Sequence, residues 1–173
     1  MRFGDQSRFA VEFEIDESRT QASACLLGHF CYWINGDVVG DFKLLVTLSD
    51  LIHPLATIVK DCGSRQGEAS CGMLSDDLFR LLHASMYGNP DFNEASAEVF
   101  PEPRAKFDIL PHEESFDEWI GYLVACGSLD ILAYWRVDAP KLSYAALPSG
   151  EFDTVVLAAF SALNAEADRR TLS

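Results

Sequence analysis

The stretch from Ala24 to Leu45 reads ACLLGHFCYWINGDVVGDFKLL, and it decides the fold of the chain. Asn35-Gly36 stands in it between two apolar runs. A tight type I′ turn needs a positive φ angle at both central residues, and the Asn-Gly pair accepts that conformation readily. The stretch therefore predicts a β-hairpin that turns at Asn35-Gly36.

The first arm of this hairpin is apolar on both faces. One face carries Leu26, Phe30, Tyr32 and Ile34, and the other carries Leu27, Cys31 and Trp33. A strand with one face in water would alternate apolar and polar residues. We therefore expect this arm to be a central strand that is covered on both sides.

The rest of the chain offers strand and helix patterns joined by short connections. Further strands are predicted at Phe9–Asp16, Lys106–Leu110, Phe116–Cys126, Asp130–Val137 and Lys141–Ala146. Apolar residues at helical spacing predict helices at Thr47–Asp61, at Ser75–Tyr87 and from Ser149 onward. Pro54 either kinks the first helix or marks its first turn. Residues 1–173 are thus predicted to form a single α+β domain, mainly an antiparallel β-sheet with about three helices packed on one face.

The charge of the chain is strongly acidic. Thirteen Lys and Arg residues stand against 27 Asp and Glu residues, which gives a formal net charge of −14. This charge repels nucleic-acid backbones and anionic membranes, and it favours either a basic partner or simple solubility. The first residues hold no apolar signal segment, and no apolar run is long enough to span a membrane. We therefore expect a cytoplasmic protein without nucleic-acid or membrane partners.

The five cysteines suggest reduced thiols rather than a disulfide framework. Their number is odd, and no two of them form a Cys-x-x-Cys pair. Cys62 and Cys71 bracket a polar loop, where a bond between them or a shared metal is the alternative, but no second pair of ligands accompanies them. We expect five free cysteines, no metal and no cofactor.

Catalytic and nucleotide-binding motifs are not evident in the sequence. Neither a Gly-x-x-x-x-Gly-Lys-Ser/Thr loop nor a Gly-x-Gly-x-x-Gly turn occurs, and the histidines are scattered. His29 lies inside the central strand, where a hydrogen-bonded core role is more common than a ligand role. Cys31 shares a strand face with His29, but any two residues that are two apart do so, and the pair is weak evidence for a nucleophile.

Two acidic clusters are candidate binding surfaces. Glu12, Glu14 and Asp16 share one face of the first predicted strand. Residues 112–119, HEESFDEW, place Glu113, Glu114, Asp117 and Glu118 around Phe116 and Trp119. Same-face carboxylates on a straight strand lie about 7 Å apart, too far to share one metal ion. Each cluster is either a solvated face or a surface that docks a basic partner, with Phe116 and Trp119 as its anchors in the second case.

Several short motifs, taken in order, resemble the Immunity protein 42 family. They are Phe3-Gly4-Asp5, residues 9–16, Gly28 with residues 30–36, Val39-Gly40-Asp41, Phe107-Asp108-Ile109, Phe116-Asp117 with Trp119, Cys126-Gly127, and Leu147-Pro148 with residues 150–152. Each motif is structural in type, so the specificity comes from their order. The loops Cys62–Gly72 and 89–105 have no counterpart and are interpreted as insertions.

The resemblance implies a function that the composition alone does not give. Members of such a family would be bacterial cytosolic proteins, not enzymes, that bind and neutralise a cognate polymorphic toxin exchanged between competing cells. No catalytic residue is carried over. The charge agrees, because toxins that act on nucleic acids tend to be basic and an acidic inhibitor can be steered to them.

We therefore expect a basic, nuclease-like toxin domain as partner. The alternative is a small acidic α+β enzyme or ligand-binding domain, which a pocket lined by His29 and by carboxylates with displaced pKa values would favour.

Overall fold

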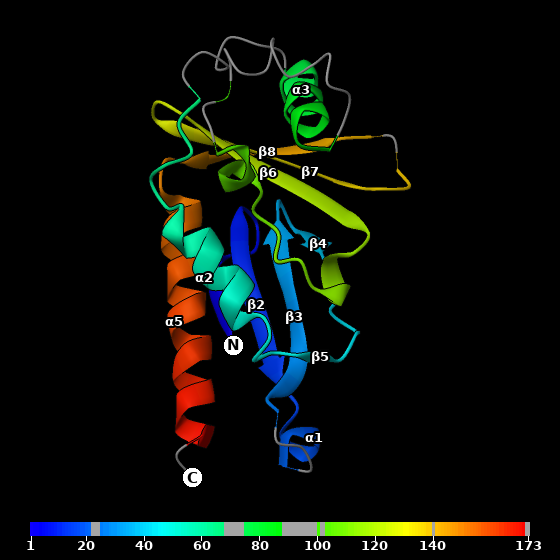
Figure 1. Ribbon diagram of the computed structural model, residues 1–173, viewed down its shortest axis with the longest axis vertical. Coiled ribbons are helices and arrows are strands. Elements are labelled where there is room, and N and C mark those ends of the chain that lie inside the picture. The colour runs from blue at the N-terminus through cyan, green and yellow to red at the C-terminus, as the bar shows by residue number, and fades with distance from the viewer. Residues whose placement is uncertain (22–24, 68–74, 88–99, 101–102, 140, 172–173) are drawn as a thin grey trace.

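The computed structural model describes residues 1–21, 25–67, 75–87, 100, 103–139 and 141–171, which form two antiparallel sheets with helices packed against them (Figure 1). The larger sheet contains β1 (Arg2–Asp5), β2 (Phe9–Ile15), β3 (Leu27–Ile34), β4 (Asp37–Val39) and β5 (Val46–Thr47). The smaller sheet contains β6 (Trp119–Cys126), β7 (Leu129–Arg136) and β8 (Ser143–Pro148). The helices are α1 (Glu17–Gln21), α2 (Ile52–Lys60), α3 (Ser75–Tyr87) and α5 (Glu151–Thr171), with short 3-10 helices η3 (Arg104–Phe107) and η4 (Glu114–Phe116). The predicted α+β class with antiparallel pairing is confirmed, although the strands divide between two sheets.

The hairpin forms as predicted at Asn35-Gly36. The φ angles are +53° at Asn35 and +85° at Gly36, and Ile34 pairs with Asp37 across the turn. Leu26, Phe30, Tyr32 and Ile34 are all buried. The opposite face is covered only in part, because Trp33 stays partly exposed. Polar side chains cover the rest of Trp33, and its indole N–H donates a hydrogen bond to Glu12 at 2.7 Å.

The return arm of the hairpin is much shorter than its apolar sequence suggests. Strand β4 ends at Val39, and the next residue, Gly40, has a φ angle of +102°. A Cβ atom at Gly40 would lie 3.0 Å from Cε1 of Phe116, so the glycine also lets the Phe116 ring approach the backbone. The chain then leaves the sheet and returns as β5, which pairs with the start of β3.

The helices confirm two predictions and correct a third. Helix α3 has the predicted bounds, and α5 begins two residues after Ser149. The first predicted helix begins late, at Ile52, because Thr47 belongs to β5. Pro54 therefore lies in the first turn of α2, where its missing N–H costs no intrahelical hydrogen bond.

Two segments differ from their predicted structure, and one further strand forms where none was predicted. Lys106–Leu110 is not a strand, since η3 ends at Phe107 and only an isolated bridge joins Asp108 to Tyr122. The strand predicted to begin at Phe116 begins at Trp119 instead, after η4. Residues 2–5 form the edge strand β1, which is too short for an alternating pattern to stand out in the sequence.

Two hydrophobic cores lie on the two faces of the smaller sheet. Side chains alternate along β6, so Leu123 joins the core that contains Tyr32 and Phe152, while Tyr122 and Val124 join a core beneath α3. Figure 1 shows the smaller sheet between α3 and the larger sheet, with α2 and α5 alongside the larger sheet. The smaller sheet is therefore the middle layer, which explains why its strands are apolar on both faces.

A buried arginine ties the helical side of the molecule together. Arg65, which is 2% exposed, donates to the carbonyls of Ile58 at 2.6 Å and Lys106 at 2.7 Å, and pairs with Asp153 at 2.8 Å. Its guanidinium also lies 5.5 Å from the centre of the Phe152 ring. These contacts connect the end of α2 and η3 to the first turn of α5, and thereby fix the elements that line the cleft described below.

The cysteines do not all match the prediction of free thiols. Cys25, Cys31 and Cys62 are free, but Cys126 is disulfide-bonded, so the prediction is wrong for this residue. Cys71 and most of the predicted loops Cys62–Gly72 and 89–105 lie outside the described residues. None of the helices among the described residues combines the length and the apolar character that a membrane span requires.

Candidate functional site: an acidic loop beside a cleft

The second acidic cluster lies on the connection between η3 and β6. Asp50, from a distant part of the chain, lies near it. Glu114 and Asp117 are exposed and Glu113 is half-buried. Burial and the nearby charges of Asp50, Glu114 and Asp117 raise the pKa of Glu113. We call Asp50, Glu113, Glu114 and Asp117 the loop cluster.

The charge of the loop cluster is not compensated. Among the described residues, no lysine, arginine or histidine forms an ion pair with any of its members. Glu118, the fourth carboxylate of the predicted cluster, differs, because it pairs with Arg136. The loop cluster is therefore a concentration of like charge that costs folding free energy.

The two aromatic residues of the predicted surface are not exposed anchors. Phe116 is 3% exposed, and its ring packs against Phe30 and Tyr32 with centroid distances of 5.9 and 5.3 Å. Trp119 is partly buried against the same core and lies 6.5 Å from the Tyr134 ring. The prediction of Phe116 as an anchor is thus corrected: turning this ring inward is what holds the acidic residues on either side of it at the surface.

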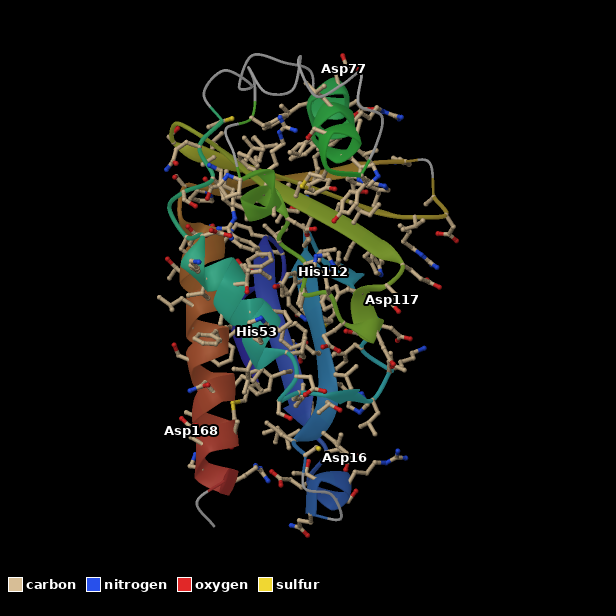
Figure 2. The ribbon with its side chains drawn as sticks, viewed as in Figure 1. Asp16, His53, Asp77, His112, Asp117 and Asp168 are labelled. Atoms are coloured by element: carbon tan, nitrogen blue, oxygen red, sulfur yellow. The ribbon has the colours of Figure 1, made fainter. Side chains whose placement is uncertain are left out.

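The first acidic cluster is largely occupied by structural contacts. Glu12 is 18% exposed at its side chain and binds Arg2 at 3.0 Å. Asp16 accepts hydrogen bonds from the Ser18 hydroxyl and the Arg19 backbone N–H at the start of α1, and these bonds lower its pKa. Of these three carboxylates, Glu14 alone is exposed and has no ion pair or side-chain hydrogen bond with another described residue. Figure 2 shows Asp16 near one end of the molecule and Asp117 well away from it.

Next to the loop cluster the surface is hollowed by two adjoining cavities of about 280 and 390 Å³. Both are lined by Tyr87, Asp108, Leu110 and His112, and we call them together the Asp108 cleft. The smaller cavity continues to His83, Tyr122 and the loop-cluster residues Glu113 and Asp117. The larger continues between α2 and the end of α3, to Pro54, Thr57, Ile58, Asp61 and Met86. Elements far apart in the sequence thus meet at one carboxylate.

Asp108 is the polar centre of the cleft. Its side chain is 15% exposed, accepts the Leu110 N–H at 3.2 Å and lies 3.4 Å from both the Tyr87 hydroxyl and Nε2 of His112. This contact with Asp108 raises the pKa of His112. The cleft is lined by four carboxylates, Asp61, Asp108, Glu113 and Asp117, and the described residues that line it include no lysine or arginine.

Burial shifts the pKa values of two neighbouring groups in the cleft. Burial lowers the pKa of His83, whose Nδ1 lies 2.9 Å from the Tyr122 hydroxyl, and burial raises the pKa of Tyr122. Both groups are therefore neutral near pH 7. The described lining residues include no serine or cysteine. The arrangement offers hydrogen bonds and negative charge to a ligand.

The histidine singled out by the alternative function lies elsewhere. Nδ1 of His29 is 2.9 Å from the carbonyl oxygen of Leu44, so this histidine is hydrogen-bonded to the connection between β4 and β5, and it lines neither cavity. Burial raises the pKa of Cys31 to about 12, which keeps its thiol protonated. Among the described residues, no group of three or more His, Cys, Asp or Glu side chains is placed to hold a metal ion.

Sequence reasoning missed the centre of the cleft. Asp108 lies in a segment for which the sequence predicts a strand, and Tyr87 and His83 lie in a segment for which it predicts only an amphipathic helix. Their spacing on α3 was the available signal, because a histidine and a tyrosine four residues apart lie on one helical face. Nothing local, however, indicates that this face meets Asp108.

Comparison with known proteins shows the family of this chain and a solved structure with a similar fold. The model of the family Immunity protein 42 matches residues 1–161, so the chain belongs to this family, as the motif order predicted. Among solved structures, CdiI from Burkholderia dolosa AUO158 is similar, with a TM-score of 0.70 and 18% sequence identity over 93% of this chain and 99% of that chain. At this identity the likeness shows a shared fold. No curated protein matches the chain.

Proposed function

We propose that this protein is an immunity protein that binds and neutralises a cognate bacterial toxin, with the loop cluster as part of the contact surface. Membership of the Immunity protein 42 family supports the immunity role, and the chain shares its fold with CdiI. The observation that carries the proposal is the uncompensated charge around Glu113. A basic partner would relieve this repulsion on binding.

The proposal extends to the nature of the partner and the mode of inhibition. A net charge of −14 would steer a basic, nuclease-like toxin domain to the acidic surface at high rate. Inhibition then follows from occupation of the toxin's surface, with no reaction performed by the immunity protein. Such a protein acts in the cytoplasm, where an incoming toxin of this kind meets its target.

Co-expression tests the function directly. The chain is produced together with the toxin domain encoded by the adjacent upstream reading frame, and cell survival and co-purification are scored. We expect survival and a stable complex. Death of the cells despite abundant folded protein would overturn the immunity role against that toxin.

A pair of charge-matched variants tests the surface. Glu114→Lys with Asp117→Lys alters the loop cluster, and Glu14→Lys with Asp168→Lys alters exposed carboxylates elsewhere. Each pair raises the net charge from −14 by 4, to −10. We expect only the first pair to lose protection while both stay folded. If the second pair alone loses protection, the contact lies at Glu14 or Asp168 and the loop cluster is excluded.

A further inference from the structure

We infer that the Asp108 cleft receives an arginine side chain of the toxin, with the guanidinium on the Asp108 carboxylate. The inference rests on the proposed function and specifies the chemistry of the contact. The Asp108 cleft, a recess beside the loop cluster, would anchor one side chain of the toxin. The loop cluster would attract the toxin at longer range.

The shape and lining of the cleft suit a side chain with a long apolar stem and a charged end. In the larger cavity the walls include Pro54, Ile58 and Met86, which can cover methylene groups. Asp108 lies where the two cavities adjoin, so a side chain entering along this wall would reach its carboxylate. A purely apolar side chain would remove water from that carboxylate without adding a hydrogen bond or an opposite charge.

The electrostatics of the cleft select a cation. Asp61, Asp108, Glu113 and Asp117 line it, and the described lining residues supply no permanent positive charge to compete. His112 is the nearest competitor at 3.4 Å, but its side chain is exposed and can move aside. Asp108 accepts hydrogen bonds at 3.2 to 3.4 Å, longer than charged pairs usually show, and its oxygens can accept more.

Tyr87 favours arginine over lysine. Tyr87 lines both cavities and is 62% exposed. A planar guanidinium can stack on such a ring while it donates two parallel hydrogen bonds to a carboxylate. An ammonium group can make the ion pair but not this combined contact.

Two variants test the cleft in the whole 173-residue chain, with binding to the toxin domain measured by surface plasmon resonance. Asp108→Asn removes the charge while its side-chain oxygen can still accept the Leu110 N–H. Thr57→Trp fills the larger cavity from an exposed position on α2, and Lys60→Trp, exposed on the same helix but outside the cleft, is its control. We expect the first two to weaken binding about 10- to 100-fold, mainly through faster dissociation, and Lys60→Trp to bind like the native protein.

Mutations in the toxin domain identify which of its side chains enters the Asp108 cleft. Each arginine and lysine of the toxin domain is replaced by alanine, and each is combined with Asp108→Asn in a double-mutant cycle. One arginine should lose its effect when Asp108 is already replaced. Native-like binding by both Asp108→Asn and Thr57→Trp would overturn the inference, and coupling to a lysine would replace the arginine by an ammonium group.

The proposed function is judged separately, by the survival that the native chain gives. If the native chain protects the cells and both cleft variants bind the toxin like the native protein, only the cleft inference is overturned. Loss of protection by the native chain itself would sink the immunity role.

Discussion

The ring of Phe116 packs against that of Tyr32, with centroids 5.3 Å apart and planes inclined at 60°. This contact joins the loop that carries the acidic cluster to the central strand of the larger sheet. Gly40 favours this contact, since a Cβ atom there would lie 3.0 to 3.4 Å from atoms of the Phe116 ring and would force the ring to shift. The positions of Glu113, Glu114 and Asp117 are therefore set by a buried aromatic contact, while the like charges of the loop cluster repel one another.

Replacement of Phe116 by alanine should destabilise the protein rather than abolish a direct toxin contact. The change removes a buried ring and leaves a cavity, at a cost of about 3–5 kcal/mol. Urea unfolding of Phe116→Ala and of the milder Phe116→Leu measures the effect. Binding by the folded fraction of Phe116→Leu should stay close to native. A Phe116→Ala protein as stable as the native one would contradict the packing role.

Replacement of Arg65 by methionine should be among the most damaging single changes. The Asp153 carboxylate and two backbone carbonyls would lose their donor in a nearly water-free site, at a cost of about 3–5 kcal/mol. Asp153→Asn alone and the double variant complete a mutant cycle by urea unfolding. We expect the double variant to be less destabilised than the sum of the single ones. Strict additivity would show that the two residues do not interact.

Replacement of Glu113 by glutamine should stabilise the protein near neutral pH. The pKa of Glu113 is raised above its ordinary value of 4.5, so the folded state binds more protons than the unfolded state between these values. The stability of the native protein therefore falls as pH rises through that window. Glu113→Gln lacks this loss and should unfold at higher temperature near pH 7, but not near pH 4.

Thermal unfolding of the two proteins between about pH 4 and about pH 8 measures the difference. The pKa of His112 is also raised, by Asp108, so its stabilisation too is lost as pH rises through the raised value. This contribution is present in both proteins and largely cancels in the comparison. A constant difference in melting temperature across the range would contradict the assignment to Glu113.

Association with a basic toxin should be strongly sensitive to salt. Raising the salt from low ionic strength to 0.15 M shortens the Debye length to about 8 Å, which screens the loop cluster from an approaching partner. We expect the association rate to fall about tenfold or more while the dissociation rate changes little. Stopped-flow mixing measures both. The Glu114→Lys, Asp117→Lys variant should show a weaker dependence on salt, and an unchanged dependence would mean that other charges steer the encounter.

The sequence alone determined the features that depend on neighbouring residues. Asn35-Gly36 predicted the hairpin because the required φ angles are a local property of those two residues. The apolar stripe of Ser75–Tyr87 predicted α3 with its full length, and the order of short motifs predicted the family. The same local view misjudged 106–110, where one isolated bridge replaces a strand, and Cys126, whose bonded state depends on another part of the chain.

Tertiary structure alone decided which of the candidate residues face solvent and what they meet. Phe116, Asp117 and Glu118 are consecutive, yet one lies in the core, one belongs to an uncompensated cluster and one pairs with Arg136. Asp50 joins Glu113, and Tyr87 joins Asp108, although nothing in the intervening sequence signals either approach. The physical reason is that burial and electrostatic potential depend on distances through space. Those distances are set by long-range packing, such as that of Phe116 on Tyr32 and of Arg65 on Asp153, and not by the spacing of residues along the chain.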